Sequence, residues 1–498
     1  MMISKKFILS NKAILLFSVL LIVFRLSLIT TGHRFEGDEG RYQNAIDFWG
    51  KFFEGHFGQA ISHLYNAQAR PGFILLSLIP AGLQRIVAHL NILDPSNIHF
   101  FDIPSFFNAL VTLIKDIFFY RILSLLVSKR SIAIVGTIVY SLLINTNVYI
   151  RHLSPYDYSL LIFLIVLFLI LREQIIGPLS SRSAALCGAL SAFGSLVYPG
   201  YYVFTIIMAI FIMASAGFSF RPLAIHTVCF LGVILFCEFI SQMVGRSYLL
   251  DCLILSSTVT HGSFEEGFLF IFRYLKEVEG IIGLVLLFLF LLYGIFLWPK
   301  DLKPSKYLLV AAVFMFSIHA ILGIVFFKIV FYGRALHMYF PFLVMGAART
   351  LDLIPQRSWR KIFMIFFIVC SIFSFVPSAY RYSRVSYPRE VYLQYLSDIP
   401  KSRILWILPD EKVDPSIYTD YLALAVNFLP YFGIPKEPCN PIPPTHMVLV
   451  VSRPHPLNFV AYTFEHYKPE ERKLVKERKY KMQIYMDPAL KNDKSSRD

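Results

Sequence analysis

The chain is built from long apolar runs separated by short polar segments. A membrane-spanning helix needs about 20 predominantly apolar residues. Eleven runs approach this length: residues 13–30, 104–127, 132–150, 156–172, 184–198, 200–217, 223–243, 280–298, 307–327, 329–348 and 361–377. The first run follows Lys5, Lys6 and Lys12, and no small-residue cleavage site comes after it, so we expect an uncleaved span. The pattern therefore predicts a multi-pass, helical membrane protein.

Residues 72–90 form a further apolar run that contains Pro80, Gln84, Arg85 and His89. If this run lies flat at the membrane surface, the basic loop residues and the N-terminal lysines fall on one side, as the positive-inside rule requires. If it crosses, the later basic loops conflict with the N-terminus. We therefore predict an interfacial helix here, eleven spans, a cytoplasmic N-terminus and an outer C-terminus. The deciding loop residues are Lys129, Arg130, Arg172, Arg182, Arg221, Lys300, Lys303, Lys306, Arg349, Arg357, Arg360 and Lys361.

This topology places three large polar segments outside. They are a first outer loop at 31–103, a second at 244–279, and the region beyond residue 380. We predict a transmembrane body at 1–380 and a small outer-facing α/β domain at 381–498, where strand-like runs alternate with helical patterns. The strand-like runs are 402–410, 446–453 and 481–486.

Composition strengthens the membrane assignment. Hydrophobic residues make up 56% of the 498 positions, charged residues 16%, and the mean hydropathy is +0.60, whereas soluble domains carry about 25% charge. The net charge of +15 would form a stripe on a soluble face in a nucleic-acid-binding protein. Here the basic residues fall in short loops, so we expect membrane lipids, and no nucleic acid, as partners.

An acidic pair, Asp38 and Glu39, follows the first span closely in the segment TGHRFEGDEGRYQNAIDFWGKFF. Glycines bracket the pair, and Arg41 and Tyr42 come directly after it. A solvated loop with local ion pairs is one interpretation. The aromatic and apolar residues that resume after Tyr42 favour a folded cap that holds both carboxylates near the membrane surface.

The GDEGRY motif, the outer loop with an interfacial helix and the outer C-terminal region together resemble the GT-C membrane glycosyltransferases. Within that class the chain is similar to family 39, the protein O-mannosyltransferases, and to the bacterial enzyme that transfers aminoarabinose to lipid A. The similarity covers about the first 350 residues. It implies a GT-C fold and transfer of a sugar from a polyprenyl-phosphate donor to a hydroxyl group.

The resemblance assigns roles to the first motif. Asp38 matches the general base that receives the proton of the acceptor hydroxyl, a role that an ionised carboxylate fills when it is aimed along the line of attack. Glu39 stands beside it. Arg41 and Tyr42 match residues that either touch substrate or position the loop.

Two further motifs match family elements in part. In QARPGF, Arg70 takes the place of a lysine that meets the donor phosphate, while Ala69 replaces the family's glutamate. A guanidinium suits a phosphodiester because it pairs two oxygens at once. In RHLSPYDYS, Asp157 matches a second acidic position that binds substrate. The alternatives are an interfacial anchor for Arg70, and for Asp157 a helix cap that pairs Arg151 or His152.

The motif FYGRALHMYFPF completes the expected phosphate site. Arg334 matches a lysine that precedes a Tyr-x-x-Pro element, with Met338 at the tyrosine position and His337 and Tyr339 beside it. An arginine in an apolar run needs an anionic partner or must reach the surface. In THGSFEEGF, His261 matches a histidine near the donor phosphate, although the expected arginine after it is absent; a solvated histidine is the alternative.

These parts imply an inverting transferase at the outer face of a bacterial inner membrane. Arg70 and Arg334 would neutralise the donor phosphate as its bond to the sugar breaks. The acceptor is a lipid, a glycan or a protein. One acidic pair with nearby arginines needs no metal or other cofactor, and a divalent cation at Asp38 stays open.

Three other classes remain as alternatives. A purely structural membrane protein would leave Asp38 freely replaceable. A lipid-linked glycan ligase or polymerase would share the phosphate-binding arginines but rely on a large late outer loop. A glycolipid transporter or flippase would place charges along a path through the spans. The segment VYPGYYVF at 197–204 lacks the lysine of a related family turn, so we expect only a structural break there.

Overall fold

The computed structural model shows a bundle of helices, in agreement with the predicted class of helical membrane protein. The residues it describes are 11–30, 41–66, 70–93, 98–261, 269–303, 305–325, 333–383, 407–408 and 448–449. Asp38 and Glu39 lie outside them, as does most of the predicted C-terminal domain.

The first nine helices cover the first outer loop and the first spans. They are α1 (Asn11–Thr30), α2 (Gln43–Phe53), α3 (Phe57–Leu64), α4 (Pro71–His89), α5 (Asp102–Leu126), α6 (Arg130–Ser141), α7 (Asn145–Val148), α8 (Tyr156–Ile176) and α9 (Ser181–Val197). Local sequence explains where two of these helices begin. The Ser180 side chain accepts from Ser183 N–H (3.2 Å) and so caps the start of α9. Pro71 occupies the first turn of α4, where a missing N–H costs nothing.

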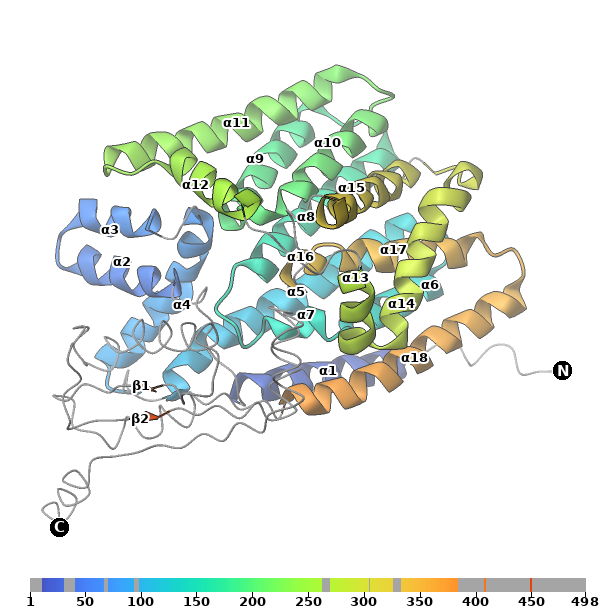
Figure 1. The fold of residues 1–498 in the computed structure, drawn as a ribbon, viewed down its shortest axis with the longest axis horizontal. Helices are drawn as coiled ribbons and strands as arrows, with labels where there is room; N and C mark the ends of the chain where they lie inside the picture. The colour runs from blue at the N-terminus through green and yellow to red at the C-terminus, as the bar shows by residue number, and fades with distance from the viewer. Residues whose placement is uncertain are drawn as a thin grey trace, which may run out of the picture.

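The second half continues the bundle. Its helices are α10 (Tyr202–Ser215), α11 (Phe220–Met243), α12 (Tyr248–His261), α13 (Leu269–Tyr274), α14 (Ile281–Leu292), α15 (Lys306–Val325), α16 (Gly333–His337), α17 (Phe340–Leu353) and α18 (Arg357–Ser383). Short segments of tighter or wider winding are η2 (Ile98–Phe101), η3 (Pro199–Tyr201), η4 (Leu275–Glu279), η5 (Tyr293–Leu297) and η6 (Trp298–Lys300). Figure 1 shows α11 along one edge of the bundle and α1 beside α18 along another.

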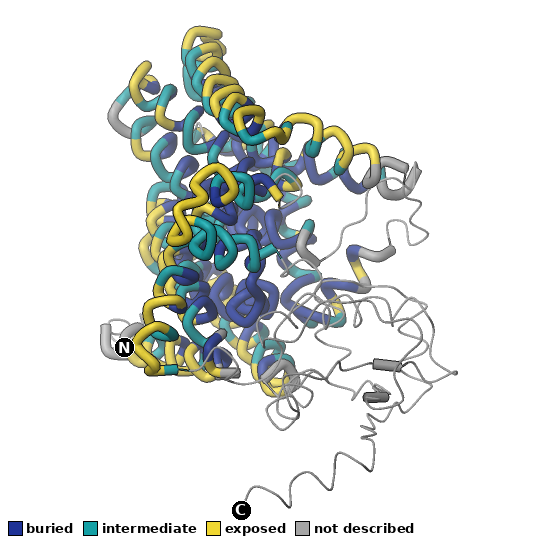
Figure 2. The backbone as a smooth tube through the Cα atoms, turned by 90° about the vertical axis from the view of Figure 1, so that its left-hand side faces the viewer, coloured by how far each residue is buried: buried dark blue, intermediate teal, exposed yellow. Residues whose placement is uncertain are grey.

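The outside of the bundle is apolar. Buried positions run through the middle and exposed ones along the periphery (Figure 2), and the exposed residues of α11 include Phe220 (73% exposed), Phe236 (66%) and Met243 (70%). Continuous exposed apolar surface of this kind marks a membrane protein. Among the described residues, four helical segments are long and apolar enough to cross a membrane: Pro71–His89, Phe220–Met243, Ile281–Lys300 and Arg357–Tyr380.

Helix α4 is one of these four, yet its start and its second half contact the same end of the bundle. Near its start, Gly72 packs against the backbone of Val197, where α9 ends. Further along, Gln84 Nε2 donates to the carbonyl of Phe100 (2.8 Å), just before α5 begins. The end of α9 lies beside the start of α8, where Ser159 donates to the Gly194 carbonyl (2.9 Å). We call this the α4 end of the bundle.

A polar cluster ties helices together at the opposite end. Arg349 on α17 donates to Asp301 (2.9 Å) and Asp352 (2.6 Å). Arg349 and Lys303 also donate to the Leu126 carbonyl at the end of α5 (3.3 and 2.9 Å). The ends of α5 and α17 and the loop before α15 are thus joined.

Two predicted spans are broken. The run 132–150 forms α6 and the short α7, and the run 329–348 is interrupted between α16 and α17. In the first case side chains replace helical backbone bonds: Asn147 Nδ2 donates to the carbonyls of Ser141 (3.0 Å) and Leu143 (2.8 Å). The count of eleven spans stays a prediction.

In the C-terminal region the structure describes two short strands, β1 (Ile407–Leu408) and β2 (Val448–Leu449). They pair in parallel, with Ile407 opposite Val448. Both fall within runs predicted as strands. The rest of the expected α/β domain lies outside the described residues and stays a prediction.

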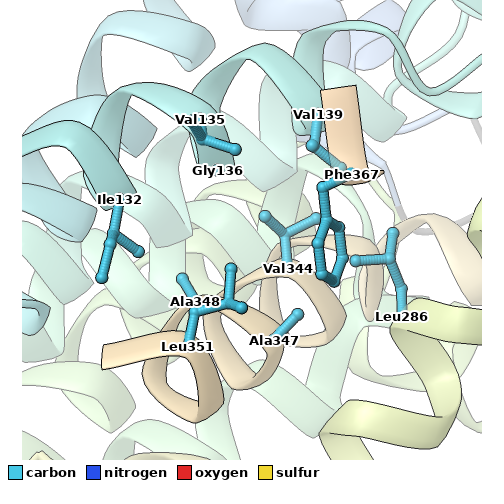
Figure 3. Close-up of a pocket in the computed structure, with 10 residues that line it drawn as sticks. All are labelled: Ile132, Val135, Gly136, Val139, Leu286, Val344, Ala347, Ala348, Leu351 and Phe367. Carbon is cyan, nitrogen blue, oxygen red and sulfur yellow. The ribbon is translucent and has the colours of Figure 1, made fainter. Parts of the chain in front are cut away.

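A small apolar pocket lies between α6, α14, α17 and α18 (Figure 3). Its lining residues are Ile132, Val135, Gly136, Val139, Leu286, Val344, Ala347, Ala348, Leu351 and Phe367. No predicted site residue lines this pocket.

Candidate functional site

The predicted site residues differ in how far the structure describes them. Arg334 belongs to α16 and His261 to α12, but their side chains lie outside the description, as do Asp38 and Glu39 entirely. Six predicted side chains remain: Arg41, Tyr42, Arg70, Asp157, His337 and Tyr339. Of these, Arg70, Asp157 and His337 belong to one buried cluster.

Asp157, in the first turn of α8, is the centre of this cluster and is 1% exposed. Its Oδ2 accepts from the Thr112 hydroxyl (2.8 Å), and its Oδ1 forms an ion pair with the Lys115 ammonium. His337 Nε2 lies 2.8 Å from the same Oδ1. Because a carboxylate beside a cation only accepts, Nε2 of His337 is the donor. These contacts join α5, α8 and α16, which are far apart in sequence.

His337 is completely buried, and both of its ring nitrogens have partners. The second nitrogen, Nδ1, lies 2.5 Å from Asn145 Oδ1. The sequence predicted a phosphate contact for His337. In this arrangement the ring connects the end of α16, the helix that carries Arg334, to α7 and α8. The phosphate contact stays a prediction.

Asn145 continues the network toward the second outer loop. Its Nδ2 donates to the Tyr274 hydroxyl (2.7 Å). Glu279, which is 2% exposed, accepts from the backbone N–H groups of Ile144 and Asn145 at 2.8 Å each. Burial raises the pKa of Glu279 to about 7, although the two backbone hydrogen bonds act in the opposite direction. This carboxyl therefore caps α7 and connects it to η4.

A second buried ion pair anchors the end of α1. Arg25 Nη1 lies 2.7 Å from Asp116 Oδ2, and Arg25 Nε donates to Asn147 Oδ1 (2.9 Å). Ser141 donates to the same Asp116 oxygen (2.9 Å). The pair therefore fixes the second half of α1, the helix that precedes the segment with the predicted general base, against α5.

Arg70 reaches the cluster through a series of aromatic rings. It is 5% exposed, and its guanidinium carbon lies 4.9 Å from the centre of the Tyr198 ring. Tyr198 contacts Tyr156 (4.8 Å between ring centres), Tyr156 contacts Tyr149 (4.8 Å), and Tyr149 contacts His337 (4.7 Å). Arg70 and His337 thus belong to one continuous set of buried contacts at the α4 end.

Two other predicted residues have different surroundings. The Tyr339 hydroxyl lies 3.0 Å from His319 Nδ1, and His319 Nε2 lies 3.0 Å from the Tyr202 hydroxyl. Tyr42 is buried and donates to Gln84 Oε1 (2.7 Å), which joins the start of α2 to α4. For Tyr42 this contact favours the loop-positioning role over substrate contact.

Sequence reasoning missed several members of this network, including Lys115, Thr112, Asn145, Glu279 and His319. A signal existed for some of them. Lys115 and Asp116 stand within an apolar run, as Arg25 does in the first run, and an ionisable group in a span is a functional candidate in itself. Nothing in the sequence indicated which of these groups pair.

Within the described part of the chain, no group of three or more histidine, cysteine, aspartate or glutamate side chains is arranged to hold a metal ion. Asp38 is outside that part, and a divalent cation there stays open. No protein-family model matches the chain, and no curated protein matches its sequence.

Proposed function

We propose that this protein is a membrane glycosyltransferase of the GT-C type. It transfers a sugar from a polyprenyl-phosphate donor to a hydroxyl of a lipid, glycan or protein acceptor, with inversion at the anomeric carbon. The observation that carries the proposal is the series of contacts that connects Arg70, through three tyrosine rings, to His337 and Asp157 at the α4 end of the bundle. The resemblance assigns all three of these residues to substrate or donor phosphate.

We also propose eleven spans, with the α4 end facing the outside of a bacterial inner membrane. The contacts of Gly72 and Gln84 support an α4 that lies across this end rather than along the bundle. Lys303 and Arg349 both donate to the Leu126 carbonyl at the opposite end, which fits a cytoplasmic face rich in basic residues.

In the proposed reaction the hydroxyl oxygen of the acceptor attacks the anomeric carbon, and Asp38 accepts the proton of that hydroxyl. The bond between that carbon and the donor phosphate oxygen breaks, and the phosphate keeps the electron pair. Arg70 and Arg334 offset the growing negative charge, as preorganised cations do in transition states. Asp157, paired with Lys115, acts as a positioning residue that holds α16 through His337.

A transfer assay with paired aspartate variants tests this function. The purified full-length protein is incubated with a radiolabelled polyprenyl-phosphate hexose and candidate acceptors. We expect Asp38→Asn to lower the transfer rate by at least about 100-fold, the scale of general-base catalysis. Asp47→Asn is the control, because Asp47 lies on α2 of the same loop and accepts a hydrogen bond from Gln43 of that helix (3.2 Å).

Full transfer by Asp38→Asn would remove the general-base assignment. Absence of transfer from every polyprenyl-phosphate sugar, with the wild-type protein folded, would favour the ligase or transporter alternatives. A transporter would move the intact donor between the leaflets of a vesicle without consuming it.

A further inference from the structure

The turn between α9 and α10 carries three tyrosines that contact different parts of the molecule. Tyr198 contacts Arg70, Tyr201 packs in the buried core, and Tyr202 reaches His319. The sequence predicted only a structural break at this turn. We propose that residues 198–202 form a positioning platform for two donor-phosphate residues, Arg70 from the first outer loop and Tyr339 from the junction of α16 and α17. This inference rests on the proposed function.

The first half of the platform is the face of the Tyr198 ring. Tyr156 and Tyr201 meet this ring edge-on, with ring centres 4.8 and 4.9 Å away and interplanar angles of 87° and 88°. The ring is thereby fixed, and the Arg70 guanidinium lies 4.9 Å from its centre. A ring face attracts a guanidinium without neutralising its charge, as a carboxylate would. The Tyr198 ring therefore sets the position of the Arg70 guanidinium.

Two glycines, Gly200 and Gly72, make close contacts that allow the Tyr198 ring and the Arg70 guanidinium to meet. A Cβ added at Gly200 would lie 2.6 Å from the Tyr198 ring, so the glycine lets the ring fold back over its own turn. A Cβ added at Gly72 would lie 2.7 Å from the Val197 nitrogen. Gly72 thus brings the start of α4, and Arg70 two residues earlier, against the residue that precedes Tyr198.

The second half of the platform acts through a hydroxyl group. Tyr202 is 44% exposed, and its hydroxyl lies 3.0 Å from His319 Nε2. The other nitrogen of His319 lies 3.0 Å from the buried Tyr339 hydroxyl. His319 is thus held between two tyrosines, and the same turn that contacts Arg70 also orients Tyr339.

The two contacts differ in chemistry, so replacing each tyrosine by phenylalanine should weaken phosphate binding at one position and leave it unchanged at the other. Purified full-length protein in lipid nanodiscs is titrated with a long-chain polyprenyl phosphate and, separately, with the uncharged polyprenol. Tyr198→Phe keeps the ring face and should leave the Kd for the phosphate within about twofold of wild type. Tyr202→Phe loses the hydroxyl and should raise the Kd for the phosphate about fivefold, the usual effect of one hydrogen bond.

Two more variants complete the test. Tyr198→Leu and Arg70→Lys each remove the stacked contact and should raise the phosphate Kd about tenfold. The double variant should add little to either single change, because both remove the same interaction. Affinity for the polyprenol should be unchanged throughout, which separates positioning of the cation from general damage to the fold. If Tyr198→Leu does not fold, Gly200→Ala gives this readout, because its added Cβ would lie 2.6 Å from the Tyr198 ring and would displace it.

Wild-type affinity in Tyr198→Leu, alongside weakened binding in Arg70→Ala, would overturn the platform while leaving the phosphate site intact. Equal weakening by Tyr198→Phe and Tyr198→Leu would also overturn it, since the ring face would then not be the operative contact. If wild type and Arg70→Ala bind the phosphate no better than the polyprenol, the proposed function fails together with the inference that rests on it.

Discussion

Asp157 and Lys115 form a buried ion pair at the centre of the candidate site. Both side chains are almost fully removed from solvent, and breaking a buried pair leaves one charge uncompensated. His337 of α16 bonds the same carboxylate, so Asp157 also holds α16 in position. The pair therefore affects both stability and the geometry of the predicted phosphate site.

Removal of the lysine should destabilise the protein strongly. We expect Lys115→Met to lower the free energy of unfolding by about 3–5 kcal/mol, because Asp157 would remain buried without its cation. The double variant Lys115→Met/Asp157→Asn should recover part of that loss. Denaturant unfolding in detergent measures both, with the exposed Arg121→Met on the same helix as control. Equal stability of Lys115→Met and wild type would contradict the burial of the pair.

Glu279 predicts a pH dependence of stability. Its pKa rises from an ordinary value of 4.5 to about 7, so the folded state holds this proton more tightly than the unfolded chain. The resulting stabilisation is fully present below about pH 4.5 and is lost as the pH rises through about 7. Glu279→Gln should therefore flatten the pH profile of thermal unfolding between pH 5 and pH 8. Identical slopes in the two proteins would refute the shift.

At the scale of elements, α4 is the helix whose position decides the topology. By length and composition it can span a membrane, but its contacts at Gly72 and Gln84 belong to one end of the bundle. Its exposed residues include Leu75 (47% exposed) and Leu90 (59%), near its two ends.

Cysteine labelling distinguishes the two orientations of α4. In a chain whose six native cysteines are replaced by serine, Leu75→Cys and Leu90→Cys should both react with a membrane-impermeant reagent added from outside. An α4 that crosses the membrane would instead leave Leu90→Cys reactive only from the cytoplasmic side. Labelling after permeabilisation controls for cysteines that are folded out of reach.

Sequence pattern predicted the helical elements well and their interruptions poorly. Apolar runs located helices such as α8 and α11 because hydropathy over about 20 residues is a strong signal. It could not show that Asn147 would bond the carbonyls of Ser141 and Leu143 and so end α6, because that bond depends on one local side chain. The interfacial position predicted for α4 rests on the loop charges together with the polar residues that interrupt its apolar run.

At the scale of the whole molecule, the bundle has two polar ends with different chemistry. The opposite end holds Arg349, Asp301 and Asp352 in a compact ionic cluster. The α4 end combines arginine, tyrosine, histidine and paired acids drawn from distant parts of the chain. Single motifs predicted Arg70 and Asp157 as members of a site. Their link through Tyr198, Tyr156 and His337 depends on tertiary packing, which no local pattern encodes.

The central claim is that this end performs sugar transfer from a lipid phosphate. The most direct measurement follows one radiolabelled polyprenyl-phosphate hexose of known anomeric configuration, incubated with the purified wild-type protein and acceptor. The account predicts release of the polyprenyl phosphate together with a glycosylated acceptor of inverted configuration. Retained configuration would contradict the single displacement, and an unconsumed donor would contradict the transferase itself.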